Sequence, residues 1–484
     1  MQNLRVGVIG GGAAGIGHSV VVFEKNSSVG GVWNYNEDPT ADSCTYESLR
    51  TNLPTVVMQL KGFPFPAEVP CYPSHVDVLN YLKSYAAHFH VDEVIRLNSS
   101  VTRVYKDENS AWKICVSSPD RGHYEEAVDR LVVCNGHFSK PFYSTVTGIE
   151  NFRGTIEHSK TYRAPGPYVG KNVLIVGRGP SGDEISKELM ENGAKSAIVS
   201  SEKYVAQTSN ESPDLQPQAS VDHIEADGTV VLSDGTRLAP DSVEATPQAI
   251  PLDVDDSRTM KPSIDYIDPS GKVYFIDGSY IETPDAIIFC TGYVYSFGDV
   301  LPPGLLFPEA LSRRENIGLD EDLTAEVVAA TTAGHVVAPT YKQVFSVEDP
   351  TLAFIGLPFD TTTFQCFELQ SIWMARVFSG LVELPSQSEM ISNFYEEIRQ
   401  TKSPLRKNVH CLGLKHFRYF TEISELSKSP VDVVDFALFG DAAYLLVNFE
   451  DFRSATYRQD PVTRKWTRRF KPKGSLTELV KTFD

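Results

Sequence analysis

The sequence predicts an α/β protein with two Rossmann-like domains, each built on a parallel sheet and a glycine-rich turn. Two stretches carry this prediction, one from Leu4 to Glu24 and one from Val173 to Met190. In each, a short apolar run bounded by turn residues is typical of a buried parallel strand. The glycine turns that follow these runs are candidate dinucleotide-binding sites.

In the central stretch, the apolar run ends at Val176 and residues with helical character continue from Asp183. Between them lies a Gly-x-Gly-x-x-Gly turn, Gly177-Arg178-Gly179-Pro180-Ser181-Gly182. A strand, such a turn and a helix N-terminus form a pyrophosphate site, because free amides and the positive end of the helix dipole face the anion. A tight turn that binds nothing is the alternative, but the flanking strand and helix favour the nucleotide site.

The N-terminal stretch repeats the pattern with the turn Gly10-Gly11-Gly12-Ala13-Ala14-Gly15. A second apolar run, Ser19–Phe23, leads to Glu24, which is placed to accept hydrogen bonds from a ribose diol. Only residues 11–18 separate the two runs, whereas a crossover between neighbouring parallel strands needs at least about 10 to 12 residues including its helix. This first βαβ unit is therefore expected to lack most of its helix, through a real loss or a mis-joined gene model, and to bind its dinucleotide weakly.

Composition argues against several classes of protein. The formal net charge of −19 disfavours nucleic acid as the main partner, because nucleic-acid binding depends on neutralising phosphates. Seven scattered cysteines without a close pair predict free thiols in a reducing compartment and no zinc site. The sequence shows no signal peptide and no apolar run of the roughly 18 residues that a transmembrane helix needs, so we expect a cytoplasmic protein without a transmembrane segment.

Further motifs add a family resemblance. They are Phe152-x-Gly154-x-x-x-His158-x-x-x-Tyr162, Gly30-Gly31-x-Trp33, and the runs 46–54, 134–137 and 285–293. Together they resemble the flavin-containing monooxygenases, most closely the soluble, plant-type S-oxygenating members, over most of the chain to about Trp373. The related Baeyer-Villiger enzymes carry a tryptophan where this chain has Tyr162, so the resemblance favours the heteroatom oxygenases.

The resemblance implies two cofactors, FAD at the N-terminal turn and NADPH, or NADH, at the central turn. It places Gly31 and Trp33 along the flavin and the catalytic candidate Asn52 against it, where the Asn52 amide would shield an oxygen-bearing reduced flavin from water. An asparagine before a proline-ended loop is otherwise ordinary turn chemistry. Thr291 and Gly292 are also expected at the cofactors, where the chain returns to the flavin domain.

The preference between NADPH and NADH stays open. The strand Ser196–Ser201 should end at the adenosine ribose, and the family usually has an arginine just after it. This chain has Glu202 followed by Lys203. A carboxylate would repel a 2′-phosphate and suit a free diol, whereas Lys203 could restore the phosphate contact. His158 is interpreted as a hydrogen-bonded linker residue and not as a general base.

The expected domains are a first part of the FAD-binding domain, an NAD(P)H-binding domain, a second FAD-binding part and a C-terminal extension. Their ranges are 1–165, 166–284 with an inserted hairpin at about 207–262, 285–400 and 401–484. Residues 221–235 and 264–278 echo each other, and each predicts a hairpin with glycine turns. A long helix is expected to begin at Glu368, near the flavin, and the basic run 464–473 is expected to be a solvated tail.

The implied activity is a monooxygenase reaction. NAD(P)H reduces bound FAD, O2 reacts with the reduced flavin, and one oxygen atom passes to a soft nucleophile, a thioether or an amine, of a small molecule. Such a substrate needs no protein acid or base, which agrees with a sequence that shows no Ser/His/Asp triad and no metal-ligand spacing. The short first unit leaves two alternatives open: an NAD(P)H oxidase that releases hydrogen peroxide, and a non-catalytic nucleotide-binding remnant.

Overall fold

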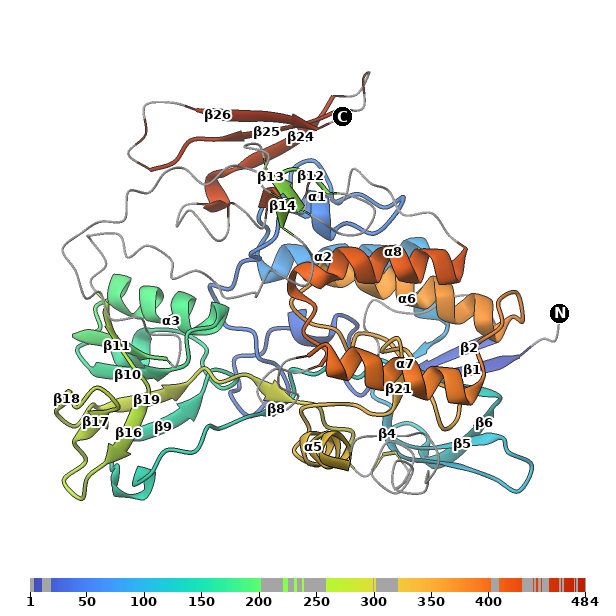
Figure 1. Cartoon of the computed structure of the whole chain (residues 1–484), viewed down its shortest axis with the longest axis horizontal. Coiled ribbons are helices and arrows are strands. Elements are labelled where there is room, and N and C mark those ends of the chain that lie inside the picture. The colour runs from blue at the N-terminus through green and yellow to red at the C-terminus, as the bar shows by residue number, and fades with distance from the viewer. Residues whose placement is uncertain are drawn as a thin grey trace.

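The structure is a computed structural model, and its described residues form several sheets and helices. They are residues 4–10, 19–201, 221–224, 230–232, 237–238, 258–298, 300–301, 321–401, 409–428, 438, 441–442, 445, 452–460, 463, 465–473, 475 and 478–483. Two sheets have a parallel core, and helices accompany both of them (Figure 1). This arrangement confirms the predicted α/β class.

The larger sheet has seven strands in the order β21-β22-β23-β7-β1-β2-β3. Their bounds are Thr340–Tyr341, Phe345–Ser346, Leu352–Phe354, Arg130–Val133, Arg5–Ile9, Ser19–Phe23 and Ile95–Arg96. The five strands from β23 to β3 are parallel, whereas β21 and β22 join antiparallel. In the centre of the sheet, Ile9 lies opposite both Phe23 and Val133.

Side chains of this sheet alternate between two apolar layers, as the pleat requires. Val8, Val22 and Val132 face a core that contains Trp373 and Phe394. That core belongs to three helices, α6, α7 and α8, with bounds Thr363–Phe378, Gln387–Arg399 and His416–Ser427. The alternate residues face a second core with an antiparallel sheet of strands β4, β5 and β6, with bounds Ser100–Lys106, Trp112–Ser118 and Gly122–Val128. Both faces are therefore covered, which explains why the strands are apolar throughout.

The second sheet has five parallel strands in the order β15-β11-β10-β19-β9. Their bounds are Thr259–Lys261, Ser196–Ser200, Asn172–Val176, Ala286–Phe289 and Thr155–His158. Helix α3 (Pro180–Glu191) packs on one face through Ile185 and Leu189. The other face packs on a small antiparallel sheet of strands β16, β17 and β18, with bounds Ile264–Ile267, Val273–Phe275 and Tyr280–Ile281.

The composition of this second sheet corrects three expected boundaries. Strand β9 lies within the range 1–165 and β19 within the range 285–400, yet both strands pair in the five-stranded sheet. Strand β15 ends at Lys261, so the expected insertion at about 207–262 stops before this strand. Sheet membership depends on which distant strand supplies the hydrogen bonds, and motif spacing alone does not reveal that partner.

The two echoing segments each contain an antiparallel hairpin, as predicted, and a third strand just beyond each segment extends it to a three-stranded sheet. The first sheet contains β12, β13 and β14, with bounds Val221–Ile224, Val230–Leu232 and Arg237–Leu238, and the second is the β16–β18 sheet. A further pair, β8 (Lys140–Pro141) with β20 (Tyr293–Val294), forms a strap between the two main sheets.

Helix boundaries follow local chemistry. Helix α2 (His75–His88) begins after Ser74, whose side chain accepts a hydrogen bond from the Asp77 amide in a capping box. Helix α6 begins at Thr363, so the prediction of a start at Glu368 was wrong. Other helices among the described residues include α1 (Thr55–Met58) and α5 (Glu321–Thr332).

The prediction that the basic run 464–473 is a solvated tail was wrong. Strands β24, β25 and β26 form an antiparallel sheet, with bounds Thr456–Gln459, Trp466–Phe470 and Leu479–Phe483. Phe470 is 1% exposed and shares a core with Val56 and Val57 of α1. The buried Arg468 donates to both carboxylate oxygens of Asp441 at 3.0 Å. The C-terminal sheet, red in Figure 1, therefore packs onto α1 and the nearby loop residues Leu53 and Tyr72.

Candidate functional site

The site begins with two glycine turns that leave the two main sheets at matching points. The Gly10 amide donates to Phe23 O at 2.9 Å, and the Gly177 amide donates to Ser200 O at 2.8 Å. Both glycines have a positive φ, +104° and +107°. A Cβ atom at Gly10 would lie 2.4 Å from Cys134 O, and one at Gly177 would lie 2.5 Å from Cys290 O. Only glycine fits at either position.

The central turn has the shape of a pyrophosphate site. Among the described residues, no atom beyond Gly179 and its local backbone neighbours lies within 4 Å of the position that a Cβ atom at Gly179 would occupy, so the backbone there is open to a ligand. A Cβ atom at Gly182 would lie 2.1 Å from Gly177 O, so that glycine lets α3 pack closely on β10. Pro180 and Ser181 form the exposed first turn of this 12-residue helix. Free amides at a helix N-terminus suit an anion, so the residues fit a dinucleotide.

Two more predicted residues lie beside this turn. Arg178 Nε lies 3.4 Å from Asp183 Oδ1, so the guanidinium is held at the turn by an ion pair. Thr291 and Gly292 follow β19 and Cys290, whose carbonyl oxygen would lie 2.5 Å from a Cβ atom at Gly177. The Thr291 hydroxyl donates to Phe142 O, and the Phe142 amide donates to Gly292 O at 2.9 Å. These hydrogen bonds connect the segments that carry β8 and β20 next to the glycine turn at Gly177.

The N-terminal turn is described only in part. Gly10 ends β1, and Glu24 follows β2 with 4% of its surface exposed. Its carboxylate accepts a hydrogen bond from the Asn26 amide at 2.8 Å. The predicted residues Gly11, Gly12, Ala13, Ala14 and Gly15 lie outside the described residues, and so does the predicted loss of the helix. Glu202 and Lys203 lie outside them too.

Asn52 lies in the loop before α1, and α1 contacts α6, whose preceding loop follows the carboxyl end of β23 in the larger sheet. The Thr51 amide donates to Pro73 O at 3.0 Å, and the Thr55 amide donates to Cys71 O at 2.7 Å, so the backbone is anchored on both sides. Asn52 itself is half-buried, and within the described part of the chain its side-chain amide makes no hydrogen bond. Its donor and acceptor are therefore available to a ligand. Gly31 and Trp33 form a short 3-10 helix, and Trp33 packs on the core that contains Met58.

Three buried polar atoms without a partner lie at the same edge. They are His137 Nε2 after β7, and Thr361 Oγ1 and Thr362 Oγ1 before α6. His137 Nδ1 lies 3.0 Å from Gly356 O, which can only accept, so Nδ1 carries the proton and Nε2 is an acceptor. Burial of its ring nitrogens lowers the pKa of His137 to about 4, so the ring is neutral. Unpaired buried groups here fit a polar cofactor that would complete their hydrogen bonds.

The signature residues connect the two sheets. The Tyr46 hydroxyl donates to Glu184 Oε2 at 2.6 Å, and the Tyr162 hydroxyl donates to Glu188 Oε2 at 2.7 Å. Glu184 and Glu188 lie one turn apart on the same face of α3. Burial, together with these carboxylates, raises the pKa of both tyrosines. A tryptophan at position 162 could not make the Glu188 contact through a hydroxyl.

His158 is a structural residue. It is fully buried, its Nδ1 accepts a hydrogen bond from the Lys160 amide at 3.0 Å, and its ring meets Tyr143 and Tyr293 edge to face. Burial lowers the pKa of His158 to about 4. A neutral ring packed in this way agrees with the prediction of a linker residue.

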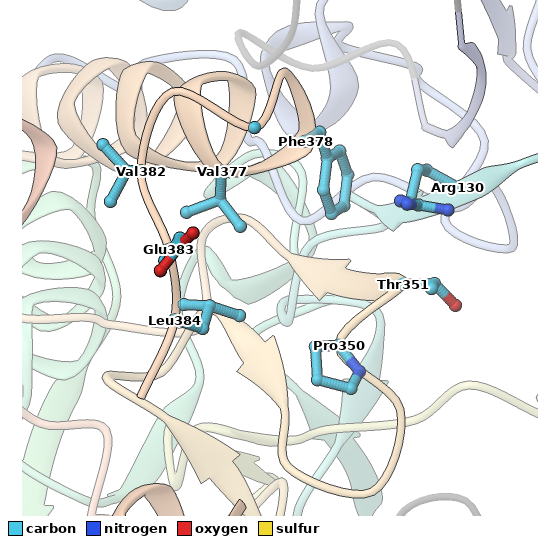
Figure 2. Close-up of a pocket in the computed structure, with 9 residues that line it drawn as sticks. Arg130, Pro350, Thr351, Val377, Phe378, Val382, Glu383 and Leu384 are labelled. Atoms are coloured by element: carbon cyan, nitrogen blue, oxygen red, sulfur yellow. The ribbon is translucent and has the colours of Figure 1, made fainter. Parts of the chain in front are cut away.

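A shallow pocket of about 440 Å³ lies elsewhere. It is lined by Arg130 at the start of β7, Phe378 at the end of α6 and apolar residues of the following loop (Figure 2). This is the amino edge of the parallel strands, whereas cofactors bind such sheets at the carboxyl edge. The pocket is therefore separate from the candidate site.

The seven cysteines are all free thiols, as expected. Across the residues that the structure describes, no helix is long and apolar enough to cross a membrane. Within the same residues, no cluster of acidic, histidine and cysteine side chains could hold a metal ion.

Sequence reasoning missed Glu184, Glu188, Thr361 and Thr362. The two glutamates lie four residues apart just after the glycine turn, and that spacing is the signal that could have indicated a shared helix face. The threonines carry no comparable pattern, because their burial depends on the packing of α6.

Comparisons with known proteins show the family of the chain. A family model described as flavin-binding monooxygenase-like matches residues 4–210 and 323–468. The chain is 32% identical to flavin-containing monooxygenase FMO GS-OX-like 2 of Arabidopsis thaliana, over 83% of this chain and 80% of that protein. It is 31% identical to FMO GS-OX3 of the same plant, over 87% and 84% of the two chains. The structure of S-allyl-L-cysteine S-oxygenase from Allium sativum superposes with a TM-score of 0.73 at 26% identity, covering 93% of this chain and 94% of that one.

Proposed function

The chain belongs to the flavin-binding monooxygenase-like family, and on this premise we propose that it uses NAD(P)H and O2 to oxygenate a soft nucleophile of a small molecule. The balanced reaction consumes NAD(P)H, a proton, O2 and substrate, and it yields NAD(P)+, water and the oxygenated substrate. The observation that carries the proposal is the pair of glycine turns at matching points of the two main sheets, with Asn52 in the loop before α1.

The flavin is assigned to the seven-stranded sheet. Gly10, Glu24, Gly31, Trp33 and Asn52 are the described residues that would hold it, together with the glycine and alanine residues from 11 to 15. When bound, FAD supplies the transfer of electrons from NAD(P)H to O2. The buried atoms of His137, Thr361 and Thr362 would gain hydrogen-bond partners from this cofactor.

The nicotinamide dinucleotide is assigned to the five-stranded sheet. The pyrophosphate would lie on the α3 amides at Gly179 to Gly182, with Arg178, Thr291 and Gly292 beside it. We favour NADPH over NADH, because Arg178 at the turn and Lys203 after β11 supply cationic groups for the extra phosphate. Two carboxylates act against this preference. They are Asp183, which forms an ion pair with Arg178, and Glu202, which precedes Lys203 in the sequence.

The substrate class proposed is a thioether, with an amine second. Sulfur and nitrogen lone pairs attack electrophilic oxygen without help from a protein base, so the protein needs only to orient the substrate and exclude water. The similarity to an S-oxygenase of S-allyl-L-cysteine favours sulfur. We place the protein in the cytoplasm, because its seven free thiols suit a reducing compartment.

A second candidate function is an NAD(P)H oxidase that releases hydrogen peroxide. Strands β1 and β2 pair in parallel register although only residues 10–18 join them. A connection of this length leaves little room for a helix whose dipole would face the flavin pyrophosphate, and a loosely held flavin is poorly protected from water.

The test is product analysis with S-allyl-L-cysteine as the probe. The purified protein, supplied with FAD, should form one sulfoxide for each NADPH consumed, and Asn52→Ala should lower the sulfoxide yield at least about tenfold while NADPH consumption continues. Peroxide in place of sulfoxide in the wild type would support the oxidase. A protein that neither binds flavin nor consumes NADPH would contradict both enzyme functions.

A further inference from the structure

Three segments that are distant in sequence meet on one face of α3. Two of them supply Tyr46 and Tyr162, which bind Glu184 and Glu188. The third is a short 3-10 helix in the C-terminal region, Phe452–Ser454, whose Arg453 Nη2 forms an ion pair with Glu184 Oε1. The Glu184 carboxylate is therefore shared between Tyr46 and Arg453.

The same guanidinium reaches the loop that carries Asn52. Arg453 Nε donates to Thr51 O at 2.9 Å, and Nη2 lies 3.5 Å from Arg50 O. Thr51 directly precedes Asn52 in the sequence. The rigid, planar fork of arginine lets one side chain bind a carbonyl on one edge and a carboxylate on the other, which the single ammonium of lysine does less well.

The ring of Phe452 supports the Arg453 side chain in this position. Its guanidinium lies 4.8 Å from the centroid of the Phe452 ring. Phe452 is 7% exposed and meets Tyr72 edge to face at 5.4 Å, in the core that joins the C-terminal sheet to α1. The C-terminal sheet thus presents a fixed cation to the junction between the two main sheets.

We propose that Arg453 is a positioning residue that fixes the Asn52 loop relative to α3, and so sets the flavin and the nicotinamide dinucleotide at their working separation. This role rests on the proposed function, in which Asn52 faces the flavin and α3 holds the pyrophosphate. The Arg453 and Glu184 side chains are 30% and 27% exposed, and an ion pair that is partly open to solvent contributes little to overall stability. The main effect of Arg453 is therefore local, on the relation between the loop and the helix.

The first test is hydrogen–deuterium exchange of the full chain, which needs no cofactor. Arg453→Met keeps the apolar stem and removes the fork. Amide exchange in residues 46–54 and 180–188 should become about tenfold faster, because both segments lose a charge-assisted contact. Arg453→Lys should give an intermediate rate. The matched control is Arg469→Met, on the same C-terminal sheet, where Arg469 is 60% exposed and pairs with Glu478. Unchanged exchange in either segment of Arg453→Met would overturn the proposal.

The second test separates positioning from simple support. In flavin-loaded protein, Arg453→Met should raise the peroxide released per NADPH about threefold or more at equal flavin content, while Arg469→Met should not. Faster exchange with an unchanged peroxide ratio would show a merely structural contact and overturn the positioning role. If the wild-type protein binds no flavin, the proposed function is contradicted. The exchange result would still show whether Arg453 couples the Asn52 loop to α3. If Arg453→Met does not fold, Glu184→Gln removes the paired charge and carries the same expected results.

Discussion

The N-terminal and central glycine turns leave their sheets with the same geometry and then differ in what joins the next strand. The backbone amides of Gly10 and Gly177 donate equivalent hydrogen bonds to the neighbouring strand. The two glycines also lie close to equivalent carbonyl oxygens, those of Cys134 and Cys290. Residues 10–18 then join β1 to β2, whereas residues 177–195, including all of α3, join β10 to β11. Parallel strand pairing is therefore retained in both units, although their connections differ by ten residues.

This difference teaches that strand pairing and anion binding have separate requirements. A five-residue strand is about 17 Å long, and nine residues of extended chain reach about 30 Å, so a short connection can return to the start of the neighbouring strand. A pyrophosphate site needs more, because the helix supplies aligned amides and a dipole. The central unit has both features, whereas the residues that follow Gly10 and lead to β2 lie outside the described residues.

The largest expected effect tests the shared geometry. Gly10→Ala and Gly177→Ala should each destabilise the protein by more than about 3 kcal/mol, because the new Cβ atom meets backbone that cannot move aside and the positive φ adds strain. Thermal unfolding of both variants measures this. A large loss for one variant and none for the other would show that the two turns are not equivalent.

Gly179→Ala tests whether the central turn binds the nicotinamide dinucleotide. Space around Gly179 is open and its φ is −96°, so alanine should leave the unfolding temperature unchanged. The methyl group would occupy the pyrophosphate site, and NADPH affinity should fall about thirtyfold, which corresponds to about 2 kcal/mol. Calorimetric titration measures this affinity. Unchanged affinity would move the nicotinamide site away from this turn.

A helix insertion addresses the short connection directly. Residues 183–192 copied after Gly15 would supply a helix to the N-terminal unit. Flavin affinity should rise about tenfold, because a helix dipole at the pyrophosphate is worth about 1 to 2 kcal/mol in favourable geometry. The control is a Gly/Ser insertion of equal length. If both insertions leave the flavin affinity unchanged, a helix dipole at this turn does not contribute to flavin binding.

A buried neutral histidine lies at the end of a strand in each main sheet: His137 follows β7 of the larger sheet, and His158 ends β9 of the second. Burial lowers the pKa of each to about 4 from the ordinary 6.5. The unfolded chain takes up the proton first, so stability falls as the pH drops from about 6.5 toward 4. Between pH 7.5 and 5.5 each histidine should account for about 1.4 kcal/mol of this fall. His137→Gln and His158→Gln should each remove that share in urea titrations, and His123→Gln, at an exposed position on β6, should not. Equal pH dependence in all three variants would contradict the assignment.

The smallest effect concerns the contact between the units. Tyr162→Phe removes the hydroxyl that binds Glu188 and should cost about 1 kcal/mol. Tyr46→Phe is the matched variant at Glu184 and should cost a similar amount. Thermal unfolding compares them, and a cost near zero for both would show that these hydrogen bonds do not hold α3 to the flavin side.

The elements predicted best are those specified by neighbouring residues. The strand before Gly177 and the two echoing hairpins depend on contacts a few residues apart, and the structure contains all of them. The glycine spacing also identified the central turn as a candidate site. Local patterns of this kind are visible in a single sequence.

The features that were missed depend on distant partners. Strand β9 pairs with β19 more than a hundred residues away. In the basic run, Arg468 and Phe470 of β25 are buried, because Arg468 donates to Asp441 and Phe470 packs against α1. Arg453 lies hundreds of residues from Thr51 and Glu184, and nothing in its local sequence indicates that contact. The start of α6 at Thr363 was missed because buried threonines look like loop residues.

The most direct test of the central claim, that two dinucleotide sites work together in this chain, is a visible absorption spectrum of protein purified with FAD supplied. The account predicts a flavin spectrum that bleaches when NADPH is added without oxygen and returns when air is admitted. A colourless, folded protein would contradict the claim. So would a flavin spectrum that neither NADPH nor NADH changes.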